Sequence, residues 1–83
     1  MAVRLHPHAA ARLRERGGTE GEVRTTVQTG ERFEARFGRT GFRRNFPFDA
    51  EWQGKRYANK QIEAYPVQEG SDWLVITVIV EYF

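Results

Sequence analysis

The sequence predicts an α+β fold in which two N-terminal helices pack on one face of a mostly antiparallel four-stranded sheet. Two observations lead to this prediction. Apolar residues recur every three or four positions up to residue 29, and at every second position from residue 31 onward. Turn sequences that contain glycine then divide the second half into strand-length segments. A chain of 83 residues accommodates a single domain, 1–83.

The helical part divides into residues 7–16 and 20–29. Pro7 suits the first turn of a helix, and a Gly-Gly pair ends that helix. Thr19 can cap the second helix, and Glu22 three residues later completes the sequence of a capping box. Helices of this length are marginal alone in water, so the sheet should cover their apolar stripes.

We expect strands at residues 31–37, 42–48, 55–67 and 73–83. In the first, Phe33, Ala35 and Phe37 alternate with charged residues, which is typical of a half-buried strand. Pro47 marks either the end of the second strand or a sheet edge. The last strand is apolar on both faces up to Glu81, which favours a central strand covered on both sides.

The last strand also carries almost no charge, and an uncovered edge there would favour aggregation. We therefore expect one of the first two strands to cross to its far side, or a second subunit to cover it. On this ground the chain is predicted to form a homo-oligomer.

Lys60 is the unusual residue of the third strand, because it shares a face with Ala58, Ile62 and Ala64. It should either extend to solvent at the end of the sheet or pair with a carboxylate. Placing Val67 opposite Trp73 would bring Lys60 across from Val80, near Tyr82. The same register would place Glu63 opposite Thr77 and Tyr65 opposite Val75, where Glu63 could act as a base or simply lie on a polar surface.

Composition excludes several classes of protein. Without cysteine there is no disulfide, no thiol nucleophile and no thiolate metal site. The longest apolar run, residues 73–80, is far shorter than the roughly 20 residues of a membrane helix. Charged residues interrupt the first 16 positions, unlike the core of a signal peptide. We therefore expect a cytoplasmic protein that has no membrane partner.

The net charge of +2 conceals an uneven distribution: residues 1–48 carry +5 and residues 49–83 carry −3. The positive charge concentrates on the first predicted hairpin, which holds Arg32, Arg36, Arg39, Arg43 and Arg44. Arginine binds phosphate and carboxylate groups well, so Arg36, Arg39, Arg43 and Arg44 are the candidate nucleic-acid-binding residues. A solvated face, an acidic protein partner, or a compositional bias of the host would give the same pattern. The interleaved phenylalanines are expected in the core rather than as stacking platforms.

His8, Arg12 and Arg16 recur at intervals of four and should share one helix face. An imidazole beside two fixed cations could serve metal-free RNA cleavage, which needs an acid, a base and stabilisation of the phosphorane charge. The alternative is structural, with His8 capping the helix and the arginines paired with carboxylates.

Residues 8–17 read H-A-x-x-R-x-x-E-R-G, and residues 75–78 read V-x-T-V. With these motifs the chain resembles a small prokaryotic domain of unknown function that is grouped with RelE- and BrnT-like toxins. The resemblance implies a compact RelE-like α/β fold; some members of the wider group cut mRNA without metal, whereas others only bind. Gly18 departs from the branched aliphatic residue usual in the family, which should weaken the packing between the helices.

Two functional hypotheses follow. The first is a metal-independent ribonuclease of the toxin type that acts on RNA or the ribosome, with His8 as acid or base and Arg12 and Lys60 stabilising the phosphorane. The second is a non-catalytic module whose arginine-rich hairpin binds nucleic acid or an acidic protein such as an antitoxin. Neither hypothesis calls for a cofactor, and the two histidines have no cluster of ligands from which to predict a metal site.

Overall fold

The computed structural model describes residues 2–83 and contains two α-helices and a five-stranded sheet. In chain order the elements are β1 (Val3–Leu5), α1 (Pro7–Glu15), α2 (Glu20–Thr29), β2 (Glu31–Glu34), the single 3-10 turn η1 (Arg36–Gly38), β3 (Thr40–Trp52), β4 (Lys55–Glu69) and β5 (Asp72–Tyr82). The predicted α+β class with two helices is confirmed. The predicted strand number is wrong, because β1 adds a fifth strand that is too short to show a periodic pattern.

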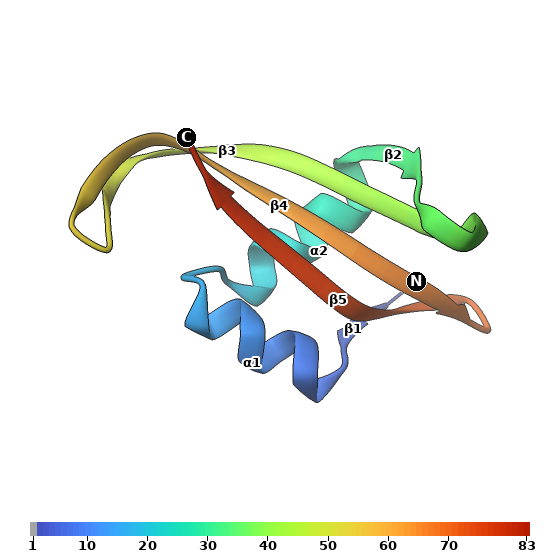
Figure 1. Ribbon diagram of the computed structural model, residues 1–83. Helices are drawn as coiled ribbons and strands as arrows, with labels where there is room; N and C mark the ends of the chain where they lie inside the picture. The colour runs from blue at the N-terminus through green and yellow to red at the C-terminus, as the bar shows by residue number, and fades with distance from the viewer. Residues whose placement is uncertain (1) are drawn as a thin grey trace.

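The strand order in the sheet is β1-β5-β4-β3-β2, with β1 parallel to β5 and the other pairs antiparallel (Figure 1). Neither of the first two predicted strands crosses to the far side of β5, because β2, β3, β4 and β5 follow one another as a meander. Instead β1 pairs there, with Val3 beside Trp73 and Leu5 beside Val75.

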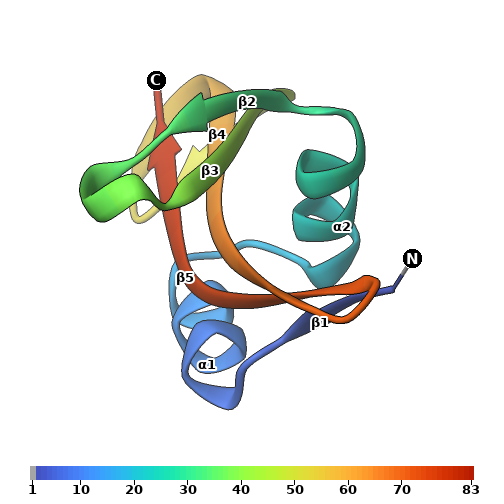
Figure 2. The same ribbon diagram turned by 90° about the vertical axis from the view of Figure 1, so that its right-hand side faces the viewer.

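Both helices lie on one face of the sheet, and α1 lies beside β5 (Figure 2). Leu13 of α1 and Val23 of α2 join Ile62, Val75 and Val78 of the sheet in one buried core. The predicted capping box of α2 is present, whereas α1 is capped by the side chain of His6 rather than by His8. A Cβ at Gly18 would overlap the side chain of Leu13, so the glycine permits close packing of the helix hairpin where a weaker contact was expected.

The predicted first strand ends early. After Glu34 the chain leaves the sheet, and the N–H of Ala35 donates to the carbonyl of Arg39 at 2.7 Å. Within this turn Phe37 has a φ of 61°, in the left-handed region that few residues other than glycine adopt. Phe37 is therefore not half-buried in a strand, as its alternating pattern suggested, but 94% exposed.

β3 continues past Pro47 to Trp52, so the proline marks an edge and not an end. The register of the β3–β4 pair shifts between Pro47 and Ala50, where Asp49 has a φ of 44°. Beyond this bulge the β3–β4 hairpin curves around one end of the sheet (Figure 1), and the ring of Trp52 near its tip lies against Gly17, in the loop between the helices, and stacks on Tyr82.

The predicted register of β4 and β5 is wrong by one residue near the turn and by two at its far end. Val67 lies opposite Leu74, and a further shift between Tyr65 and Pro66 places Lys60 opposite Tyr82. Glu63 consequently pairs with Ile79, and Tyr65 with Thr77. The face of the sheet away from the helices, called the open face below, is not covered within residues 2–83, and Ile79 there is 38% exposed.

Candidate functional site

The turn between β2 and β3 presents an aromatic ring between two cations. Arg36, Phe37 and Arg39, called the turn site below, are all exposed. Within residues 2–83 neither arginine forms an ion pair or a side-chain hydrogen bond. A large apolar side chain that is almost fully exposed adds little to packing, and its positive φ makes this turn a candidate binding site.

A groove of about 640 Å³ lies on the open face beside the turn site. Phe33, Arg36, Phe37, Arg39, Tyr65 and Ile79 line this open-face groove. The rings of Phe33 and Tyr65 meet edge to face, with centroids 5.9 Å apart, and supply its aromatic surface. Glu34 contributes a carboxylate to the lining. The groove therefore offers flat apolar surface next to two fixed cations.

Next to this groove, polar side chains of the sheet are already paired with carboxylates. Arg43 lies 3.0 Å from the Glu31 carboxylate, and this hydrogen bond and charge raise the pKa of Arg43 further. The hydroxyl of Tyr65 donates to Glu63 at 2.8 Å. Partial burial and the Glu63 carboxylate raise the pKa of Tyr65 to about 12. Tyr65 therefore stays protonated near neutral pH and is a donor, not a base.

The predicted arginine patch is thus divided between two faces. Arg43 lies on the open face and is paired with Glu31, whereas Arg44 lies on the helix side and donates to the hydroxyl of Thr29 at 2.9 Å. Arg36 and Arg39 lie at the turn. Of the four candidate nucleic-acid-binding arginines, only these two are without a partner in the described residues.

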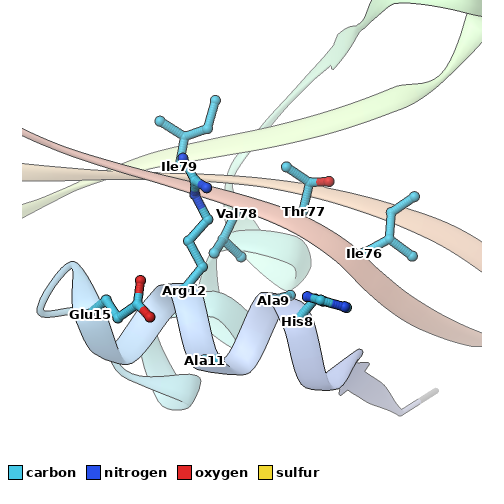
Figure 3. Close-up of a pocket in the computed structure, with 9 residues that line it drawn as sticks. All are labelled: His8, Ala9, Ala11, Arg12, Glu15, Ile76, Thr77, Val78 and Ile79. Carbon is cyan, nitrogen blue, oxygen red and sulfur yellow. The ribbon is translucent and has the colours of Figure 1, made fainter.

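His8 and Arg12 lie in a second groove, of about 540 Å³, between α1 and the outer edge of β5 (Figure 3). His8, Arg12, Glu15, Ile76, Val78 and Ile79 line this edge groove. Arg12 extends from α1 toward β5, and Glu15 follows one turn later on the same side (Figure 3). Neither Arg12 nor Arg16 forms the carboxylate pair expected of a structural role within residues 2–83.

Lys60 is buried under the helices, with 6% of its surface exposed. Its Nζ lies 2.9 Å from Glu22 and donates to the carbonyl of Gly17 at 3.2 Å. Beside it, the hydroxyl of Tyr82 donates to the carbonyl of Arg16 at 2.7 Å. The carboxylate predicted to hold Lys60 is therefore Glu22, and these contacts join the helix hairpin to β4 and β5.

His8, Arg12 and Lys60 line no common groove: the edge groove holds the first two, and Lys60 lines none of the grooves described for residues 2–83. In this part of the chain no three His, Asp or Glu side chains gather where they could hold a metal ion. None of its helices is long and apolar enough to cross a membrane.

Comparisons of the chain with family models, with curated proteins and with solved structures found no significant match. The resemblance to RelE- and BrnT-like toxins therefore stays a prediction that rests on the two motifs in the sequence.

Phe37 is the functional candidate that sequence reasoning missed. The signal lay in Gly38: the tetrapeptide Arg-Phe-Gly-Arg places a glycine directly after the last residue of the predicted strand, 31–37. Had the turn been centred there, Phe37 would have fallen at its tip, between the two arginines. The other phenylalanines behave as predicted in part, with Phe42 in the core and Phe46 packed against it.

Proposed function

We propose that this chain binds single-stranded RNA through the turn site and the open-face groove and that it acts as a binding module rather than a nuclease. The observation that carries the proposal is Phe37, 94% exposed between two arginines without ion-pair partners. Proteins that hold single strands combine cations for the phosphates with aromatic rings on which bases stack.

In this proposal each part of the site has a role. Arg36 and Arg39 bind phosphates on either side of a base that stacks on Phe37. A neighbouring base enters the open-face groove against Phe33 and Tyr65. A duplex is disfavoured because its bases are already stacked and cannot reach the ring. Glu34 can accept a hydrogen bond from a ribose 2′-hydroxyl, which DNA lacks.

The RelE-like cleavage hypothesis receives less support from the geometry. Its three residues do not share a groove, and Lys60 is already neutralised by Glu22. A buried ion pair has little free charge to offer a phosphorane. A nuclease would need its acid, base and cation within reach of one phosphate.

Fluorescence anisotropy with a labelled single-stranded RNA of about ten nucleotides, in EDTA, tests the binding. Phe37→Ala should weaken binding roughly 5- to 150-fold, the cost of losing one stacked base. Arg36→Ala/Arg39→Ala should reduce the slope of log K against log salt by about 1.4, because each phosphate contact on a single strand contributes about 0.7. A DNA strand of the same sequence should bind more weakly than the RNA.

The matched control is Arg24→Ala/Arg56→Ala, which removes the same charge from arginines that pair with Glu20 and Asp49 away from the groove. This control should lower affinity less than the turn-site variants do. Equal losses would reduce the binding to general electrostatics and overturn the proposed site. RNA cleavage in EDTA that is lost in His8→Ala and Arg12→Ala would instead establish the nuclease.

A further inference from the structure

The outer edge of β5 is covered over only part of its length. β1 pairs with residues Trp73, Leu74 and Val75, and the edge groove begins directly afterwards. Residues 76–82 of β5 therefore have β4 on one side and no strand on the other within the described chain. Beside this bare stretch lies α1, which lines the groove on the helix side (Figure 3).

The hydrogen-bond pattern shows which backbone groups this edge presents. Asn59 and Phe83 exchange both of their backbone hydrogen bonds, at 2.7 and 3.0 Å. Since such pairs alternate along an antiparallel ladder, Glu81, Ile79 and Thr77 also face β4. The N–H and C=O groups of Val78, Val80 and Tyr82 therefore point outward, and no bond joins them to α1.

The opposite side of the same sheet has features that prevent pairing with another chain, in contrast to the bare β5 edge. Beyond its pairing with β2, the outer edge of β3 contains Pro47 and a bulge at Asp49. Proline, bulges and charges are the devices that keep sheet edges from pairing with other chains. Residues 77–82 have no proline and no register shift, and their only charge is Glu81. The one bulge leaves Ile76 without a partner on β4, at the start of the bare stretch.

We propose that β5 of a second copy of this chain pairs antiparallel with this edge, about a two-fold axis at Ile79. This register uses the regular part of the bare stretch, residues 77–81, since Val78 then faces Val80 of the second copy. The two Ile79 side chains meet on the open face. Glu81 faces Thr77 of the second copy, so no like charges stand opposite each other. Cross-strand pairs of β-branched residues are favourable in sheets.

The edge groove fits the same symmetry. It carries one cation and one anion, Arg12 and Glu15, on neighbouring turns of α1. A two-fold interface brings the same surface of each copy together, so Arg12 of one copy can pair with Glu15 of the other. A second copy therefore supplies partners both for the outward N–H and C=O groups of β5 and for Arg12 and Glu15. An arbitrary extended peptide would supply only the backbone partners. The interface does not include the turn site, although Ile79 also lines the open-face groove, so the dimer is tested by its mass in solution and not by RNA binding.

The mass in solution, measured by light scattering after gel filtration at about 100 μM, should be twice 9.7 kDa. Ile79→Lys would place two ammonium groups at the two-fold axis and should give a monomer. The monomer tolerates this lysine, because Ile79 is 38% exposed and lies opposite Glu63. Val67→Lys, at a residue 37% exposed on β4, is the matched control and should leave the dimer intact.

Two further measurements locate the contact. Arg12→Glu should dissociate the dimer, and Arg12→Glu/Glu15→Arg should restore it. Hydrogen exchange at Val78 and Val80 should be at least tenfold slower in the dimer than in Ile79→Lys, whereas Thr77 and Glu81, bonded to β4, should be protected in both. A monomeric wild type, a dimer that survives Ile79→Lys, or a dimer lost in Val67→Lys would overturn the proposal.

Discussion

Lys60 connects the helix hairpin to the sheet through a buried ion pair. Its ammonium contacts Glu22, which also accepts from the N–H of Thr19 at 2.9 Å in the capping box. The ring of Phe48 lies 5.3 Å from the ammonium and completes its surroundings. Charges removed from water are costly unless each is paired, so this contact is sensitive to loss of either partner.

Lys60→Met should therefore lower the free energy of unfolding by roughly 3 kcal/mol, because it leaves Glu22 without its partner. Glu22→Gln keeps the capping box but leaves the buried Lys60 without a charged partner, so it should also destabilise the protein. The double variant Lys60→Met/Glu22→Gln should recover much of the loss, as measured by urea unfolding. Additive losses in the double variant would show that the two side chains are not coupled.

Tyr65 gives the protein a specific sensitivity to alkali. In the unfolded chain the pKa of its hydroxyl is about 10, and in the folded protein partial burial and Glu63 raise the pKa to about 12. The folded state thus binds more protons than the unfolded state between these values. Stability falls as pH rises wherever the folded state binds more protons, so this contribution is complete below pH 10 and lost by pH 12.

Tyr65→Phe should accordingly flatten the fall in melting temperature between pH 10 and pH 12. Part of the slope should remain, because burial and Glu22 also raise the pKa of Tyr82. Tyr57→Phe is the control, since the hydroxyl of Tyr57 bonds to no carboxylate in the described residues. A wild-type slope in Tyr65→Phe would mean that this hydroxyl does not carry the alkaline transition.

Elements governed by local interactions were predictable from the sequence, and those governed by distant contacts were not. The capping box at Thr19 fixed the start of α2 to the residue, because its bonds span three positions. β1 was missed because three residues carry no period and its partner β5 lies 70 positions away.

Irregular backbone explains the remaining errors among the elements. Phe37 alternates correctly with its neighbours, yet the chain leaves the strand after Glu34 and turns through positive φ at Phe37 and Gly38. The register of β4 and β5 was off by one residue at the turn, and one bulge near Tyr65 added a second, so that Lys60 pairs with Tyr82 instead of its predicted partner Val80. Neither feature changes the hydrophobic pattern from which strands are predicted. A register derived from that pattern therefore differs from the observed register by the shift that the irregular backbone introduces.

At the scale of the whole molecule, the distribution of the candidate residues limits what can act together. Sequence spacing placed His8 and Arg12 on one helix face, and the structure brings both to the edge groove. Sequence spacing could not place Lys60 relative to His8 and Arg12, because their distance depends on how the helices cross the sheet. The arginine patch was located on the correct hairpin, but the strand pairing divides it between the turn and both faces.

The dimer and the RNA-binding site together predict a dependence on RNA length. A two-fold axis at Ile79, perpendicular to the sheet, leaves the open faces of both copies on the same side. Two turn sites would then face one strand, and binding to the second becomes intramolecular once the RNA spans both.

A single-stranded RNA of about 30 nucleotides should therefore bind at least tenfold more tightly than one of about eight, because linked sites gain through effective concentration. Arg12→Glu, which should dissociate the dimer, should abolish this difference while each copy still binds the short strand. Arg12→Glu/Glu15→Arg should restore both the dimer and the length dependence, which separates assembly from the charge change at position 12. Anisotropy titrations with the two oligonucleotides measure the ratio. If the ratio is unchanged in monomeric Arg12→Glu, the long strand gains affinity from additional contacts on one copy, and the two turn sites do not act together.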